Sequence, residues 1–172
     1  MILFELLYFM LPAYVANMMP VLVKKVPFLN SPVDGSQKLF GKPILGNHKT
    51  WRGILFGMLG GIGMGGFQFL IHINVLSINY AQSWFLLSVC LAGGALLGDA
   101  IKSFFKRRFN IAPGLSWKVF DQLDYVSGAL CLTAPFFWPG IENAIILLVI
   151  SGIGHVLINH VGFWVGINKK KW

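Results

Sequence analysis

Two long stretches of the chain carry almost no charge. No Asp, Glu, Lys or Arg occurs between Gly53 and Gly98, and only Glu142 occurs between Tyr125 and Asn168. Because about 20 apolar residues of helix cross the ~30 Å hydrocarbon core of a bilayer, such runs predict membrane-spanning helices. The pattern therefore predicts an all-α membrane protein with five transmembrane helices in a single domain, residues 1–172. The five helices are expected at 2–23, 53–73, 83–107, 118–138 and 141–166.

The composition supports a membrane protein. Hydrophobic residues make up 56% of the chain and charged residues only 12%. Soluble domains carry roughly 25% charged residues, so this chain could not cover a soluble surface with polar groups. The same composition excludes a disordered chain, a collagen and a disulfide scaffold. Cys90 and Cys131 stand in apolar segments without metal or redox spacing, and we expect them to pack as small hydrophobic side chains.

Basic segments alternate with neutral ones along the chain. Lys and Arg concentrate in 24–52, 106–118 and 169–171, whereas the connections 74–82 and 139–141 contain none. Because cytoplasmic loops are enriched in Lys and Arg, this alternation predicts a multi-pass protein of the cell (plasma) membrane with its N-terminus outside and its C-terminus cytoplasmic. The net charge of +8 lies beside membrane helices. The expected partners are therefore the lipid bilayer and phosphorylated substrates, and not nucleic acid.

The helix expected at 53–73 contains a run of glycines between Gly57 and Gly66. Their spacing partly matches a dinucleotide-binding fingerprint, which requires a preceding strand and an exposed turn. Here the run falls inside a membrane segment, where small residues let helices approach closely. The better interpretation is helix packing.

Three carboxylates are expected at one depth near the cytoplasmic surface. Asp99 lies close to the end of the third helix, and Asp121 and Asp124 lie one turn apart at the start of the fourth. Three carboxylates that converge would repel one another unless a cation joined them. Hard oxygen ligands beside phosphate groups favour Mg²⁺. These three residues are therefore the candidate metal ligands.

Asp99 begins a polar stripe on the third helix. Lys102, Ser103 and Lys106 follow it at positions i+3, i+4 and i+7, which share one helical face. Ionisable groups at membrane depth are costly and are usually functional. The alternative is that Asp99 merely pairs with Lys102 or Lys106, while the two acids of the next helix complement its dipole.

The segment 30–53 is rich in Gly, Pro, Ser and Asn, which predicts turns rather than a helix. Residues 41–50 resemble a P-loop, but two residues too many separate Gly46 from Lys49, and no βαβ unit surrounds them. Backbone N–H groups and cations before a helix N-terminus still make a natural phosphate cradle. The alternative for this loop is contact with lipid headgroups, and Asp34 could serve only to shape a turn.

The candidate nucleotide-binding residues are drawn from this loop and from the end of the third helix. They are Ser31, Asp34, Lys38, Lys42, Asn47, Lys49, Thr50, Arg52, Ser103 and Arg107. Within this group Lys49, Arg52 and Arg107, together with Lys106, are expected to face the metal site and hold the β- and γ-phosphates of a nucleotide. The basic tail 169–171 is expected to touch only anionic lipid.

The sequence resembles the CTP-dependent cytidylyltransferases of phospholipid synthesis, and most closely their short archaeal branch, the CDP-archaeol synthases. The resemblance rests on three stretches, 30–53, 98–108 and 113–128. The bacterial pattern Gly-Asp…Ser…Lys-Arg…Pro-Gly…Asp-Arg-x-Asp is matched in order by Gly98, Asp99, Ser103, Lys106, Arg107, Pro113, Gly114, Asp121 and Asp124. Gln122 replaces the bacterial Arg, and the bacterial Lys-Asp is missing around Asn110; both departures point away from the bacterial lipid substrate.

The resemblance implies transfer of CMP from CTP to 2,3-bis-geranylgeranylglycerol phosphate, which yields CDP-archaeol and pyrophosphate. The implied cofactor is Mg²⁺, and the implied catalytic residues are Asp99, Asp121, Asp124 and Lys106. Two anionic substrates require a cationic pocket, and a lipid substrate requires that the pocket open sideways between helices. Because a lipid phosphate is already anionic at pH 7, in-line positioning and charge neutralisation suffice without a strong general base.

Three other functions are alternatives to transfer of CMP to the archaeal lipid phosphate. A transporter of an anionic metabolite would use a similar basic cavity, but the sequence shows no internal repeat. A CDP-alcohol phosphotransferase would need Asp-Gly-x-x-Ala-Arg, whereas Asp34-Gly35 is followed by Ser-Gln-Lys-Leu. A bacterial-type phosphatidate cytidylyltransferase remains an alternative within the same enzyme class.

Overall fold

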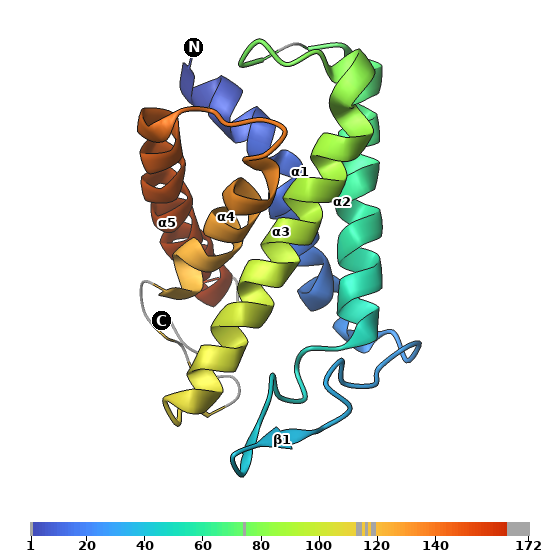
Figure 1. The fold of residues 1–172 in the computed structure, drawn as a ribbon, viewed down its shortest axis with the longest axis vertical. Helices are drawn as coiled ribbons and strands as arrows, with labels where there is room; N and C mark the ends of the chain where they lie inside the picture. The colour runs from blue at the N-terminus through green and yellow to red at the C-terminus, as the bar shows by residue number, and fades with distance from the viewer. Residues whose placement is uncertain (1, 74, 113–114, 116, 118–119, 165–172) are drawn as a thin grey trace.

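The described residues form a bundle of five α-helices with a two-stranded hairpin at one end (Figure 1). The computed structural model describes residues 2–73, 75–112, 115, 117 and 120–164. The basic tail 169–171 and Lys118 lie outside the described residues. The helices are α1 (Ile2–Leu22), α2 (Trp51–Ile71), α3 (Tyr80–Arg108), α4 (Phe120–Thr133) and α5 (Ile141–Trp164), with the 3₁₀ turn η1 at Val23–Lys25 and the strands β1 (Lys38–Leu39) and β2 (Lys42–Pro43).

Three of the described helical segments are long and apolar enough to cross a membrane. They are Ile2–Lys25, Trp51–Ile71 and Gln82–Arg108. The expected helical membrane protein is thus confirmed at this level, and the bounds of α1, α2 and α3 lie within three residues of the predicted ones. Successive helices run in opposite directions, which places the segment 26–50 and the end of α3 at the same end of the bundle (Figure 1).

Helix α4 is shorter than the sequence predicts. It has 14 residues, about 21 Å at 1.5 Å per residue, whereas the apolar pattern favours helix to residue 138. Pro135 has no N–H to continue the hydrogen-bond ladder and disfavours helical backbone at Ala134. The amides of Phe136 and Phe137 instead turn back to the carbonyl of Thr133. The hydropathy pattern alone therefore does not predict that the helix ends at Thr133.

Most of the glycines of α2 serve helix packing, as expected, whereas a Cβ atom at Gly63 would meet open space. A Cβ atom at Gly57 would lie 2.9 Å from the Leu96 side chain on α3 and 3.0 Å from the Ala16 carbonyl on α1. Gly61 lies similarly close to α1 and α3. Gly65 lies similarly close to α3 alone. Their lack of side chains lets α2 lie against α1 and α3 in the core of the bundle.

Helices α3 and α4 cross at backbone contact. A Cβ at Gly98 would lie 2.9 Å from the carbonyl carbon of Asp124, and one at Gly128 would lie 2.8 Å from the Cα of Gly98. Backbone atoms cannot rotate away as a side chain can. This crossing therefore fixes Asp99, the neighbour of Gly98, beside Asp124.

We expect Gly98→Ala to lower both thermal stability and activity, because the new methyl group would collide with the α4 backbone. Overpacking of this kind costs about 1–3 kcal/mol, and the separation of Asp99 from Asp124 should lower turnover at least ~10-fold. Thermal unfolding in detergent and a turnover assay check this. Gly93→Ala on the same helix is the matched control, since its Cβ would meet the Leu132 side chain at an ordinary 3.6 Å. Equal behaviour of the two variants would contradict the role given to the crossing.

Candidate active site

A cluster of three carboxylates surrounds one ammonium group between α3 and α4. The Nζ of Lys102 lies 3.1 Å from Asp99 Oδ1, 3.1 Å from Asp121 Oδ1 and 2.7 Å from Asp124 Oδ2. The predicted convergence of Asp99, Asp121 and Asp124 is therefore present in the structure. We call these three residues the carboxylate cluster. Lys102 belongs to the predicted polar stripe, and the alternative prediction that it pairs with Asp99 is confirmed. Its contacts with Asp121 and Asp124 on the next helix are not predicted by the sequence.

Two further lysines contact the carboxylate cluster. Lys106 Nζ lies 3.0 and 3.2 Å from the two carboxylate oxygens of Asp121 and donates a hydrogen bond to the Leu115 carbonyl at 2.6 Å. Lys49, from the loop before α2, pairs with Oδ2 of Asp99. Among the described residues, three ammonium groups thus contact three carboxylates, and the loop reaches the site through Lys49.

The carboxylate cluster is largely withdrawn from solvent. The side chain of Asp124 is 7% exposed and that of Lys102 is 14% exposed. Both oxygens of Asp124 are buried, and Lys102, whose Nζ lies 2.7 Å from Oδ2, is the cation that contacts this carboxylate among the described residues. A buried carboxylate without donors is costly unless a cation satisfies it. Lys102 is that cation in this structure, and among the described residues no group of three or more Asp, Glu, His or Cys side chains is arranged to hold a metal ion.

The segment before α2 is folded around Asp34. The Asp34 carboxylate accepts hydrogen bonds from the backbone amides of Ser36 at 3.0 Å, Leu45 at 2.8 Å and Gly46 at 3.0 Å. Burial by itself would raise the pKa of Asp34, but these donors together hold that pKa below its usual value. The ionised Asp34 carboxylate therefore holds three backbone amides of the loop together. The alternative role for Asp34, shaping a turn, is the one that its contacts support.

Arg108, at the end of α3, binds the β1–β2 hairpin through backbone carbonyls. Its guanidinium donates hydrogen bonds to the carbonyls of Leu39, Lys42 (3.3 Å) and Pro43 (2.6 Å). In return Lys42 Nζ donates to the Arg108 carbonyl at 3.1 Å. Lys42 thus fastens the loop to α3 in this structure. Sequence reasoning missed Arg108, because its partners are backbone carbonyls that no sequence pattern marks.

Other candidate residues lie elsewhere. Thr50 caps α2, with Oγ1 accepting from the Gly53 amide at 3.2 Å. Arg52 is buried and donates to the Val26 carbonyl, so the structure directs it toward the segment after α1 instead of the carboxylate cluster. The Ser103 hydroxyl donates to the Asp99 carbonyl at 2.8 Å within α3. Arg107 is buried. Three other candidate residues of the loop, Ser31, Lys38 and Asn47, are exposed.

An apolar cavity of about 810 Å³ lies beside the carboxylate cluster. Lys102 and Asp124 line it together with hydrophobic side chains of α3 and α4. Those hydrophobic residues include Leu97, Ile101, Phe105, Leu123 and Leu132. Charged groups and an apolar wall thus meet between these two helices, the arrangement that an amphiphilic ligand requires.

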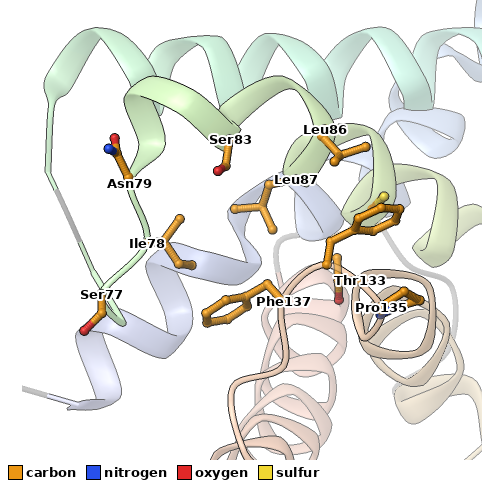
Figure 2. A pocket seen from close by; sticks show the side chains of 11 residues that line it. Ser77, Ile78, Asn79, Ser83, Leu86, Leu87, Thr133, Pro135 and Phe137 are labelled. Atoms are coloured by element: carbon orange, nitrogen blue, oxygen red, sulfur yellow. The ribbon is translucent and has the colours of Figure 1, made fainter.

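A second cavity, of about 490 Å³, lies near the start of α3 (Figure 2). Asn79, Ser83 and Thr133 contribute polar groups to its lining, and Phe137 contributes an aromatic ring. Among the described residues that line it, none is charged. A phosphate substrate needs cations, so this cavity is not a candidate active site.

The fold and the site define a helical membrane protein with a buried charged cluster next to an apolar cavity, as expected of an enzyme that acts on a charged lipid. The family model described as CarS-like, CDP-archaeol synthase, matches residues 1–172. The chain belongs to the CDP-archaeol synthase family, which confirms the resemblance and makes the protein an enzyme.

Curated relatives match along nearly their whole length. The CDP-archaeol synthase of Methanococcus aeolicus is 35% identical over 170 residues, covering 95% of this chain and 93% of the relative. That of Methanospirillum hungatei is 38% identical over 170 residues, covering 95% of this chain and all of the relative. That of Methanococcus maripaludis is 37% identical over 178 residues and covers 100% of this chain and 98% of the relative.

A solved structure shares the fold. It is described as an intramembrane enzyme for archaeal membrane lipids biosynthesis and is similar to this chain with a TM-score of 0.76. The two are 32% identical, and the match covers 88% of this chain and 90% of the other. The likeness therefore extends over most of the chain.

Proposed function

We propose that the carboxylate cluster is where this chain transfers CMP from CTP to the phosphate of 2,3-di-O-geranylgeranylglycerol, giving CDP-archaeol and pyrophosphate. Membership of the family makes the protein a CTP-dependent cytidylyltransferase of archaeal lipid synthesis. The proposal concerns the location of the active site. Asp99, Asp121 and Asp124 would hold Mg²⁺, and the observation that carries the assignment is that each places a carboxylate oxygen within 3.1 Å of one cationic atom, Lys102 Nζ.

The reaction forms one P–O bond and breaks another. An oxygen of the lipid phosphate attacks the α-phosphorus of CTP, and the bond from that phosphorus to the bridging oxygen of pyrophosphate breaks. The attacking oxygen is already ionised at neutral pH, so the protein needs to position it and not to deprotonate it. When bound, Mg²⁺ would neutralise charge on the phosphates.

The lysines around the cluster supply the remaining positive charge. Lys49 and Lys106 are the cations best placed to hold the β- and γ-phosphates, because each already contacts a carboxylate of the cluster. Ammonium groups in a partly buried site neutralise leaving pyrophosphate more strongly than they would in water. Arg52 is not included, since its guanidinium is turned to the Val26 carbonyl.

The apolar cavity between α3 and α4 is the proposed site of the lipid chains. Its wall is hydrophobic, and Lys102 and Asp124 place charge at its lining. An isoprenoid chain along Ile101, Leu123 and Leu132 would bring its phosphate to the carboxylate cluster. A lipid can then enter sideways from the bilayer without exposing its chains to water.

Purified protein should release pyrophosphate only when CTP, Mg²⁺ and the lipid phosphate are all present. Omitting the lipid or replacing CTP with ATP should reduce the release to background, and a chelator should abolish it. Colorimetric detection of pyrophosphate, together with chromatography of the lipid product, measures this. Full release without lipid would contradict the proposed acceptor, and full release in the presence of a chelator would contradict the proposed metal.

We also propose that the chain crosses the membrane five times, with α4 and the turns after Thr133 together making the fourth crossing, the N-terminus outside and the carboxylate cluster on the cytoplasmic side. A single cysteine at Asn79 should then react with an impermeant maleimide from outside whole cells, whereas one at exposed Lys38 should react only after permeabilisation. The native Cys90 and Cys131 are first replaced with Ala. The topology is wrong if both positions react from the same side.

A further inference from the structure

The cation that holds the carboxylate cluster together in this chain is one of its own side chains. An ammonium group carries three N–H donors, and Lys102 Nζ lies within 3.1 Å of an oxygen from each of the three aspartates. Lys106 contacts one of the three, and so does Lys49. Lys102 is therefore distinguished from the other two lysines by sharing all three carboxylates.

A divalent cation bound by the same three carboxylates would come within a few ångströms of this ammonium group. Two cations that close repel one another strongly in a site withdrawn from water. The metal must therefore compete with Lys102 unless the ammonium group finds another anionic partner. A phosphate group of a substrate is such a partner, and the flexible four-carbon stem of lysine allows the movement.

Lys102 has space into which it can move. It lines the apolar cavity of about 810 Å³ along with Asp124, so its side chain borders both the carboxylate cluster and the proposed lipid site. The other two lysines of the cluster do not line that cavity. A phosphate at the inner end of the cavity would lie within reach of the displaced ammonium group.

We propose that Lys102 is an exchangeable counter-ion, which holds the three carboxylates until a substrate phosphate accepts its ammonium group and a divalent cation replaces it. This inference rests on the proposed metal site and goes beyond it. It makes metal and substrate binding thermodynamically coupled: each increases the affinity for the other. Binding of the divalent cation alone is then weak because Lys102 occupies the shared position.

Mn²⁺ titration monitored by electron paramagnetic resonance tests this on the purified full chain in detergent. Without substrate, Lys102→Met should bind Mn²⁺ at least ~10-fold more tightly than the wild type, because the competing charge is gone. In the wild type, added CTP or a dialkylglycerol phosphate should tighten Mn²⁺ binding by a similar factor. In Lys102→Met this tightening should be largely lost. A protein-free titration corrects for Mn²⁺ held by the nucleotide itself.

Two further variants separate exchange from a general effect of charge. Lys106→Met removes a positive charge that contacts Asp121 but neither of the other two carboxylates of the cluster, so its Mn²⁺ affinity should rise much less than that of Lys102→Met. Lys102→Arg keeps the charge and should bind Mn²⁺ as weakly as the wild type. Thermal unfolding of each variant shows whether it is folded, and Lys102→Gln replaces Lys102→Met if the latter is not.

The outcomes distinguish this inference from the proposed function. Equal Mn²⁺ affinity of Lys102→Met and wild type, or an equal rise in both Met variants, overturns the exchange while the metal site stands. Absence of Mn²⁺ binding by the wild type even with CTP and lipid phosphate overturns the metal site itself. Tightening by CTP alone or by the lipid phosphate alone supports the exchange and identifies which phosphate accepts Lys102.

Discussion

Asp124→Asn should lower turnover by 10²-fold or more, about 3 kcal/mol of transition-state stabilisation. The substitution preserves the shape of the side chain and removes the negative charge that a divalent cation would need. The amide oxygen of Asn can still face Lys102, whose Nζ lies 2.7 Å from Asp124 Oδ2, and thermal unfolding shows whether the variant keeps its fold. Lost activity then reports on the site. Steady-state pyrophosphate release and thermal unfolding, measured on the same preparation, check both statements.

The position of Asp124 makes it a cleaner test than Asp121. Asp121 also accepts a hydrogen bond from the Trp117 amide at 2.6 Å, so Asp121→Asn would combine a catalytic defect with a weakened start of α4. Glu142→Gln is a suitable control because this exposed acid lies in the first turn of α5. Near-normal turnover of Asp124→Asn would remove Asp124 from the metal site and leave it as an acid that complements the helix dipole.

Lys49→Ala should weaken CTP binding by about 10- to 100-fold. A charged hydrogen bond in a partly buried site is worth about 1.5–3 kcal/mol, and each 1.4 kcal/mol is a tenfold change in affinity. Lys49 is the loop residue that reaches the carboxylate cluster, where it pairs with Asp99. Its removal should therefore affect the nucleotide directly. Titration with CTP by calorimetry, in detergent without anionic lipid, measures the loss.

Two sets of lysines serve as controls for Lys49. Lys24 is exposed in η1 and is not a candidate nucleotide-binding residue, so its replacement with Ala should change CTP affinity by less than twofold. Replacing Lys169, Lys170 and Lys171 together should have a similarly small effect if the tail contacts only lipid headgroups. Equal losses in all three variants would indicate general attraction of the nucleotide to a basic protein and not a phosphate site at Lys49.

Much of the site could be predicted because its residues carry a local signal. Asp99 and Lys102 are three apart on one helix, and Asp121 and Asp124 are three apart on the next, so each pair shares a face. Their common depth followed from where the apolar runs begin and end. The roles of Asp34 and Arg108 were harder to find. Both bind backbone groups that are distant in sequence, and no pattern of residue types marks a backbone amide or carbonyl.

The sequence by itself determined the membrane class, the positions of the helices and the family, because hydropathy and short motifs are properties of neighbouring residues. Only the tertiary structure decided how the charges pair. The contact between Gly98 and the Asp124 backbone sets the distance between α3 and α4, and that distance determines that Lys102 reaches three carboxylates at once. Equally, the end of α4 before Pro135 and the attachment of the hairpin to Arg108 depend on hydrogen bonds and close packing. Interactions of this kind form between segments that only folding brings together.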